Sequence, residues 1–379
     1  MKKVGLITIH GINNFGSLLQ AYATQKTIER MGYKCEIINY MYPNEYHLKQ
    51  MKVHNPYAVQ KLSFIQRVKA HFYNKYVSPS VVKRKTELFK RERERLLKLT
   101  ECYESKESLI NNPPHFDIYM TGSDQVWNPR YLYDDTTFFL PFIRGSKKIA
   151  YSSSFGSTEI DERYQRMMRP LLSDYQFIST REESGVRLIR DICGRQAVST
   201  CDPTLLLSAE EWKIVFNDPP LVKGNYILCY VLTYTANPYP YAYELIKYIK
   251  KQLKMKVVFI DETGKYWCDI RNKSIQTYGP RDIINLFQNA SFIVSSSFHG
   301  TAFSINFRKD FYSIFPRDVK DERQESLLAR VGALDRLIRV DDKFPEKERL
   351  YINNWDEISK RLEDYVALSK NYLISALEL

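Results

Sequence analysis

Hydrophobic positions along the chain alternate between strand-like and helix-like spacing. Residues 3–9 are rich in Val, Leu and Ile and predict a buried strand, and after a loop at 10–16 the apolar residues of 17–31 recur with a period near 3.6. Gly32 predicts the end of this helix, and residues 35–39 predict a second strand. A strand, a glycine-containing loop, a helix and a second strand are the usual opening of a parallel, doubly wound sheet.

The same alternation resumes further along the chain. Strands are predicted at 117–120, 147–151, 176–179, 226–232, 256–260, 292–296 and 311–315. Helices are predicted at 160–172, 182–191, 239–254, 281–289, 300–308, 321–330 and 355–377. Prolines and a glycine cluster between positions 203 and 224, which indicates a domain boundary. We therefore expect an α/β protein with two Rossmann-like domains facing a cleft, residues 1–205 and 206–345, and with 346–379 as a helix that packs back across both.

The segment from about 44 to 110 breaks this rhythm and predicts a basic helical insertion in the first domain. Between His47 and Ile110 there are 15 Lys and Arg against 6 Asp and Glu, so the segment carries +9 of the chain's net charge of +12. Apolar residues from 59 to 72 lie on one helical stripe with basic residues on other faces, and a densely charged helix is predicted at 83–97.

This basic segment suggests a negatively charged partner. The stripe at 59–72 has the form of a helix lying at an anionic membrane surface, and a helix packed on the first domain with its basic face in water is the alternative. Because the sequence carries no recognisable nucleic-acid-binding motif, nucleic acid is not an expected partner.

Composition narrows the class of protein. The chain is 44% hydrophobic and 26% charged, as in soluble globular proteins, and has no apolar run of about 18 residues that could span a membrane. Its N-terminal apolar stretch is too short for a signal peptide, so we expect a cytoplasmic protein, with peripheral attachment to the inner face of the plasma membrane as an extension. The six cysteines show no metal-type spacing, and neither a metal site nor a disulfide framework is predicted.

Ligands of open α/β sheets bind at the carboxyl ends of the strands, so the loops there are the first places to search for chemistry. In the loop at 10–16, Asn13, Asn14 and Gly16 allow tight turns ahead of a helix, where backbone N–H groups favour anions. A simple strand–helix turn is the alternative. The spacing is not GxGxxG, which argues against a dinucleotide.

A second loop, at 121–128, also follows a predicted strand. Its residues Gly122, Ser123, Asp124 and Gln125 are small or polar and would allow a phosphate or a sugar to approach closely. Trp127 in the same loop either stacks on a sugar ring or packs in the core, and core packing is favoured.

Two charged residues stand at other predicted strand ends. Arg181 has the fork geometry suited to a carboxylate or phosphate, or it forms a salt bridge with Glu182 or Glu183. Asp202 either orients a hydroxyl or a basic partner or caps the next turn, and the structural role is favoured.

His299, the only histidine in the second half of the chain, is the strongest catalytic candidate. It lies between three serines at a strand end and a helix predicted to begin at Gly300. The N-terminus of a helix holds anions and favours a neutral imidazole, which can act as a base or donate to developing negative charge. Its neighbours Ser297, Phe298, Gly300 and Thr301 are the candidates for binding the ligand, and a structural histidine is the alternative.

Taken in order, these segments resemble the polysaccharide pyruvyl transferase family. The resemblance begins at residues 7–20 and continues through GSDQVWNP at 122–129, KIAYSSSFGS at 148–157, STREESG at 179–185, DPTLLL at 202–207, SSSFHGTAFSI at 295–305 and ERQESLL at 322–328. No single motif is unique to the family, but the ordered set is specific. The resemblance covers most of the chain, and the basic region at 47–110 lies outside it.

The resemblance implies domains arranged as in GT-B glycosyltransferases, with the first on the acceptor side and the second on the donor side. It implies transfer of a pyruvyl group from phosphoenolpyruvate to a sugar of a bacterial surface polysaccharide precursor, as a ketal, with release of phosphate and without a cofactor. The acceptor would be a lipid-diphosphate-linked oligosaccharide.

The resemblance also assigns residues. The family's anion-binding arginine falls on Arg181 and its catalytic histidine on His299. Some relatives have an arginine two residues before that histidine, where this chain has Ser297, and Arg281 or Arg323 would replace it in binding the donor.

Two other functions stay open at this stage. A GT-B glycosyltransferase that uses a nucleotide sugar usually carries a carboxylate beyond the glycine loop of its second domain, and residues 301–308 contain none. A non-catalytic binding protein of the same fold would have no need of Arg181 and His299.

Overall fold

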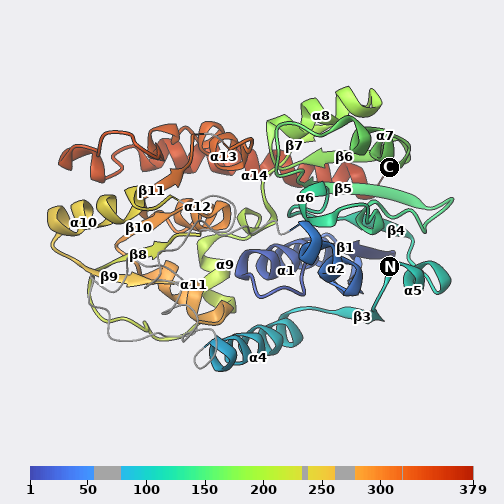
Figure 1. Cartoon of the computed structure of the whole chain (residues 1–379), viewed down its shortest axis with the longest axis horizontal. Helices are drawn as coiled ribbons and strands as arrows, with labels where there is room; N and C mark the ends of the chain where they lie inside the picture. The colour runs from blue at the N-terminus through green and yellow to red at the C-terminus, as the bar shows by residue number, and fades with distance from the viewer. Residues whose placement is uncertain (55–77, 233–237, 261–277, 318, 379) are drawn as a thin grey trace.

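Two parallel β-sheets form the frame of the chain (Figure 1). The computed structural model describes all residues except 55–77, 233–237, 261–277, 318 and 379. The first sheet has the order β3-β2-β1-β4-β5-β6-β7 and contains β1 (Lys3–Ile7), β2 (Lys34–Tyr40), β3 (Leu99–Tyr103), β4 (Ile118–Thr121), β5 (Lys147–Ser153), β6 (Phe177–Thr180) and β7 (Val198–Ser199). The second has the order β12-β11-β10-β8-β9 and contains β8 (Tyr226–Tyr230), β9 (Lys256–Phe259), β10 (Phe292–Ser295), β11 (Asp310–Phe315) and β12 (Leu337–Arg339).

Helices connect these strands and cover the sheets. They are α1 (Phe15–Arg30), α2 (Glu45–His54), α4 (Ser78–Leu96), α5 (Lys106–Asn111), α6 (Pro129–Leu132), α7 (Glu162–Ser173), α8 (Glu183–Cys193), α9 (Ala209–Val215), α10 (Tyr241–Leu253), α11 (Pro280–Asn289), α12 (Phe298–Asn306), α13 (Arg323–Val331) and α14 (Trp355–Glu378). Short 3₁₀ turns lie at Thr137–Phe139, Pro203–Leu205, Leu334–Arg336 and Lys347–Leu350.

The last helix, α14, returns to the first sheet. Its Ser369 hydroxyl accepts a hydrogen bond from the backbone N–H of Cys201 at 2.9 Å, and the Tyr372 hydroxyl donates to the carbonyl of Ala150 in β5 at 2.8 Å. The same helix packs against α13, which follows the second sheet, and Arg330 of α13 lies over the ring of Tyr365 at 4.9 Å. Helix α14 therefore ties the two sheets together.

The helices and strands expected from hydrophobic spacing are present within a few residues of their predicted bounds, but the basic segment was partly misread. It contains β3, a strand of the first sheet that pairs in parallel with β2. Charged neighbours such as Glu101 and Lys98 hid this strand, and charge is common in an edge strand because only one side is paired. The stripe at 59–72 lies outside the described residues.

Helix α4, the predicted charged helix of this segment, packs against both halves of the chain. Phe89 is buried, and Leu88 approaches Gly279 so closely that a Cβ there would lie 2.9 Å from the leucine Cβ. Arg93 donates to the carbonyl of Gly11 at 3.0 Å. Helix α4 therefore packs on both halves of the chain.

The apolar core is continuous between the two sheets, and Phe15 at the start of α1 is its central contact. The ring of Phe15 packs against Tyr230, Phe287 and Phe303 of the second half, with centroids 5.3–5.8 Å apart. Asn14 caps α1 by accepting from the N–H of Gly16 at 2.9 Å, so the helix begins two residues earlier than expected. This anchoring places the first turn of α1 directly against α12.

Candidate active site

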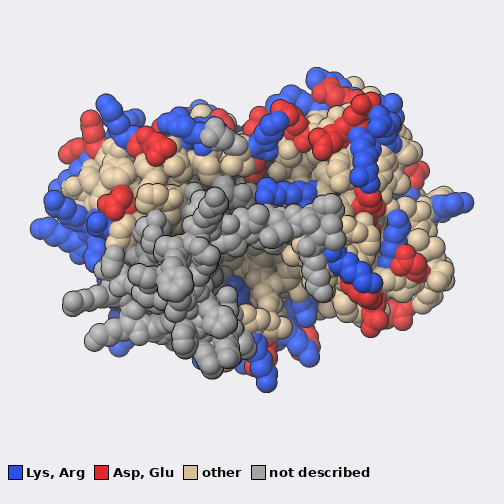
Figure 2. All heavy atoms as spheres, viewed as in Figure 1, with Lys and Arg blue, Asp and Glu red and all other residues tan. Residues whose placement is uncertain are grey.

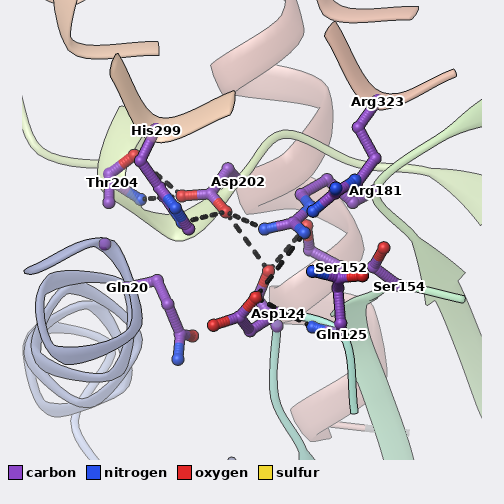
Figure 3. A network of polar contacts seen from close by, with 12 residues as sticks. Gln20, Asp124, Gln125, Ser152, Ser154, Arg181, Asp202, Thr204, His299 and Arg323 are labelled. Atoms are coloured by element: carbon purple, nitrogen blue, oxygen red, sulfur yellow. Dashed lines mark hydrogen bonds and ion pairs between the residues drawn. The ribbon is translucent and has the colours of Figure 1, made fainter. Parts of the chain in front are cut away.

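A buried carboxylate, Asp202, joins the predicted site residues of the two sheets (Figure 3). Its Oδ2 accepts from Arg181 Nη1 at 2.9 Å and from the hydroxyl of Ser123 at 3.3 Å, and lies 3.5 Å from His299 Nε2. Its Oδ1 accepts from the N–H and the hydroxyl of Thr204 at 2.9 and 2.7 Å. Asp202 caps the turn at Pro203–Leu205, as favoured from the sequence, and it is also the centre of the cluster.

The ends of parallel strands explain why residues so distant in sequence meet here. Ser123 and Asp124 follow β4, Arg181 follows β6 and Asp202 follows β7, and all three strands end at the same edge of the first sheet. His299 comes from the second sheet, in the first turn of α12 after β10. The cluster therefore forms only when the two halves pack together.

Asp124 has a backbone conformation that is unusual for a residue other than glycine. Its φ is +74°, a strained value that typically costs on the order of 1–3 kcal/mol. The carboxylate is hydrogen-bonded by the hydroxyl of Ser17 in α1 and, at Oδ1, by the N–H of Gln125 at 2.9 Å, and it lies 3.8 Å from Arg181 Nη2. Strain of this kind is common where a side chain is held in a functional position.

Gly16 makes room for His299. A Cβ at position 16 would lie 2.1 Å from Nδ1 of the imidazole, so any side chain larger than hydrogen would overlap the ring. Gly16 was predicted to allow a tight turn, whereas in the structure its lack of a side chain allows the imidazole of His299 to approach. Nε2 of His299 is buried, and 3.5 Å is too long for a good hydrogen bond to Asp202, so it has no hydrogen-bond partner among the described residues.

A small cavity of about 70 Å³ lies beside His299. Its wall includes Asp124, Phe298, His299 and Arg323, with further lining by Asn14, Gln125, Ser297, Asp321 and Gln324. Arg323, at the start of α13, donates hydrogen bonds from Nε to the two carboxylate oxygens of Asp321 at 2.9 and 3.0 Å. The structure thus brings Arg323 to the histidine.

Arg181 lies behind this wall. Its side chain is 1% exposed, and the guanidinium is stacked on the ring of Phe298 at 4.3 Å. Its Nε and Nη2 have no hydrogen-bond partner within the described part of the chain. It does not line the cavity, so the geometry favours a positioning role for Arg181 over direct contact with an anion.

The electrostatics of the cluster follow from burial and pairing. Burial opposes ionisation of Asp202, but His299, Arg181 and the N–H of Thr204 outweigh it and hold its pKa well below the usual range. Burial raises the pKa of Glu182, and the nearby Arg181 and Arg323 only partly offset it. Glu182 Oε1 accepts from the Ser154 hydroxyl at 3.0 Å.

Several predicted site residues are not brought to the cavity. Arg281 pairs with Asp218 through bonds of 2.9 and 2.7 Å and with Glu92, because α4 packs beside it. Asn13 donates to Thr86 of α4 at 2.8 Å.

Four other residues of these loops fill structural positions. Gly122 lies against Leu6 and Thr8 of the neighbouring strand region, where a Cβ would come within 2.8 Å of the leucine. Thr301 donates to the carbonyl of Ser297, and Trp127 is fully buried against Phe139 as favoured. Gly300 is the third residue of α12, which begins at Phe298 with Ser297 as its cap, and its N–H is already bonded to the Ser297 hydroxyl at 3.3 Å.

Sequence reasoning missed the residues that hold the others in place: Ser17, Thr204, Asp321 and Glu182. Thr204 stands in the DPTLLL segment, and its position two residues after an aspartate was the one available signal. Within the described residues no group of three or more His, Cys, Asp or Glu is arranged to hold a metal ion.

Comparison with solved structures identifies the fold. A putative UDP-N-acetylglucosamine 2-epimerase from Listeria monocytogenes is similar at 12% identity and a TM-score of 0.50, over 99% of this chain and 95% of that one. A UDP-GlcNAc 2-epimerase from Neisseria meningitidis bound to UDP-GlcNAc is similar at 11% identity and a TM-score of 0.49, over 100% and 99%. The likeness to the Listeria structure confirms the predicted GT-B-like α/β fold.

Comparison with known sequences identifies the family. No curated protein gives a significant match. The family model described as polysaccharide pyruvyl transferase matches residues 14–314, which include Asp124, Arg181, Asp202 and His299. The chain belongs to the polysaccharide pyruvyl transferase family.

Proposed function

We propose that this transferase moves the pyruvyl group of phosphoenolpyruvate onto two hydroxyls of a sugar in a bacterial surface polysaccharide precursor. The observation that carries the proposal is the geometry around His299, whose unbonded Nε2 lies 3.5 Å from the buried Asp202 at a small cavity that Arg323 also lines. A cavity of about 70 Å³ suits a compact donor better than a nucleotide sugar, since sites for larger ligands usually enclose roughly 300–1,000 Å³.

The reaction requires two protons to move. One sugar hydroxyl attacks C2 of phosphoenolpyruvate while C3 gains a proton, the C2–O bond to phosphate breaks, and the second hydroxyl closes the ketal. The two hydroxyl protons end on the new methyl group and on the released phosphate. A single group that titrates near neutral pH can carry both protons, and an imidazole suits this role.

Each side chain has a distinct part in this scheme. His299 moves the protons and contacts the departing phosphate, helped by the N-terminus of α12, where the helix dipole favours an anion. Arg323 binds the carboxylate or phosphate of the donor, as an arginine fork does well. Asp202 places a carboxylate 3.5 Å from the imidazole, and Arg181 holds Asp202 in position.

The proposal also concerns where the enzyme works. A lipid-diphosphate-linked oligosaccharide as acceptor would place it in the cytoplasm at the inner face of the plasma membrane. None of the described helices is long and apolar enough to cross a bilayer. On the face in Figure 2, described Lys and Arg side chains are interspersed with Asp and Glu over α7, α8 and α13, so this part of the face offers an anionic surface no patch of positive charge alone.

The test is an assay of purified protein with phosphoenolpyruvate and candidate oligosaccharides, which measures released phosphate and detects the ketal by mass spectrometry. His299→Ala should lower the rate by at least ~10²-fold, a typical contribution of a general acid–base group. His115→Ala, at an exposed position of the first domain, is the matched control and should leave the rate unchanged. Near-normal turnover of His299→Ala, or release of nucleoside diphosphate from a nucleotide sugar in place of phosphate, would refute the proposal.

A further inference from the structure

A second and much larger cavity, of about 510 Å³, adjoins the one beside His299. The two share Gln125 and Val319 in their walls. The larger cavity lies between the loops of α6 and α7 in the first half and residues 319–320 of the second half, which are joined by a hydrogen bond of 3.1 Å from Thr158 N–H to the carbonyl of Lys320. Its volume falls within the range of roughly 300–1,000 Å³ that is usual for ligand sites.

Three tyrosines dominate its wall: Tyr131 in α6, Tyr133 directly after α6, and Tyr164 in α7. Burial raises the pKa of Tyr133, and the neighbouring hydroxyls of Tyr131 and Tyr164 add to the effect, so the three phenols are grouped together. Tyrosine offers an apolar ring face and a polar edge, which matches the C–H faces and hydroxyls of a pyranose ring.

The polar groups of the wall are neutral amides and balanced charges. Asn128 and Gln125 supply amides, which both donate and accept hydrogen bonds, as sugar hydroxyls also do. The charged lining residues are Arg130, Lys320, Glu159 and Asp161, two of each sign, and Lys320 is ion-paired with Glu159. This balance favours an uncharged polyhydroxyl ligand over a nucleotide or a phosphate.

Gln125 belongs to the walls of both cavities, and it lies beside Asp124 in Figure 3. Its Oε1 accepts from Asn128 Nδ2 at 2.7 Å, and Gly156 allows this placement because a Cβ there would lie 2.1 Å from the same oxygen. The amide is therefore fixed between the two cavities. A ligand that extends from the outer cavity past Gln125 would reach Asp124 and His299.

We propose that this outer cavity binds the sugar residues of a neutral oligosaccharide next to the one that reacts, so that the enzyme selects an oligosaccharide chain over a single sugar. The proposal rests on the function proposed above, because it takes the inner cavity as the place of reaction. Tyr164, which is half-buried in the wall of this cavity, is the residue to test first.

The experiment is binding of the full-length protein to an array of neutral bacterial polysaccharide fragments from one to six sugars long. Wild type should bind the longer fragments, and Tyr164→Ala should lose at least roughly tenfold in affinity for them, the value of burying one aromatic ring. Tyr351→Ala, which removes a 49% exposed tyrosine on the second half, is the matched control and should bind as wild type does.

A parallel measurement separates this proposal from the proposed reaction. Stabilisation of the same three proteins by phosphoenolpyruvate, read as a shift in thermal midpoint, should be equal in all of them because the inner cavity is unchanged. If glycan binding increases with glycan length and is lost in Tyr164→Ala, the proposed role of the outer cavity is supported even if phosphoenolpyruvate has no effect. If wild type does not bind glycans, or if Tyr164→Ala binds them equally well, the proposed role of the outer cavity is overturned even if phosphoenolpyruvate stabilises the protein.

Discussion

Replacing Gly16 by alanine should disable His299 without unfolding the protein. The added Cβ would lie 2.1 Å from Nδ1, 2.3 Å from Cγ and 2.7 Å from Cε1, whereas ordinary contact begins near 3.4 Å. The imidazole must therefore withdraw by about 1.3 Å, the difference between 3.4 and 2.1 Å, or the two halves must separate by a similar distance. A misplacement of about 1 Å at a reacting group can cost roughly 10²-fold in rate, which is the loss expected for Gly16→Ala.

The effect on stability should be small because two contributions oppose each other. Overpacking at a buried contact costs about 1–3 kcal/mol, while alanine in place of glycine in α1 contributes about 1 kcal/mol in favour of the helix. The assay is phosphate release with phosphoenolpyruvate and acceptor, together with thermal unfolding. Gly11→Ala, in the loop that precedes α1, is the matched control, since a Cβ there would meet only the Tyr42 carbonyl at 3.5 Å.

A double-mutant cycle tests whether the loss passes through the histidine. If Gly16→Ala acts by displacing His299, adding it to His299→Ala should cause almost no further loss of rate. A loss in the double variant equal to the sum of the two single losses, on the logarithmic scale, would refute this reasoning.

Two further predictions concern the charges around the cavity. Asp202→Asn should destabilise the protein at pH 7 by about 3–5 kcal/mol, as breaking a buried ion pair does. Because its ion-pair partners outweigh burial and depress the pKa of Asp202, the stability that this carboxylate contributes is present above about pH 4 and is lost as the pH falls toward the folded-state pKa. In thermal unfolding, the difference in stability between wild type and variant should therefore shrink below about pH 4, and a constant difference would contradict the assignment. Arg323→Lys should weaken binding of phosphoenolpyruvate by roughly 10-fold or more in titration calorimetry. The control Arg281→Lys should bind phosphoenolpyruvate as wild type does, because Arg281 lies away from the cavity and pairs with Asp218. Equal losses of affinity in the two variants would show that Arg323 is not the arginine that binds the donor.

The sequence was informative where the site follows from strand ends. Ser123, Arg181 and Asp202 each follow a strand of the first sheet within three residues, and parallel topology brings such positions to one edge whatever their separation along the chain. His299 was recognisable because a histidine among hydroxyls at a strand-to-helix turn is an unusual surrounding.

The contacts between the two halves could not be read in this way. Nothing in the pattern around Gly16 indicates that the imidazole of residue 299 lies against it, because the two come from different sheets. Arg281 was predicted as a residue that binds the donor. In the structure it pairs with Glu92 of α4, and α4 belongs to the segment that was predicted to be a separate insertion. The packing of one half of the chain against the other decides which arginine reaches the cavity. The pattern of residues within one segment does not predict this packing.

The charges of the cluster bear on how the cavity could hold an anionic donor. With Glu182 kept closer to neutral by its raised pKa, the carboxylates Asp124, Asp202 and Asp321 outnumber the two guanidinium groups of Arg181 and Arg323 by one. The cluster by itself therefore offers no surplus positive charge to an anionic donor. The remaining attraction for an anion comes from the N-terminus of α12, whose positive end lies in the turn that carries His299.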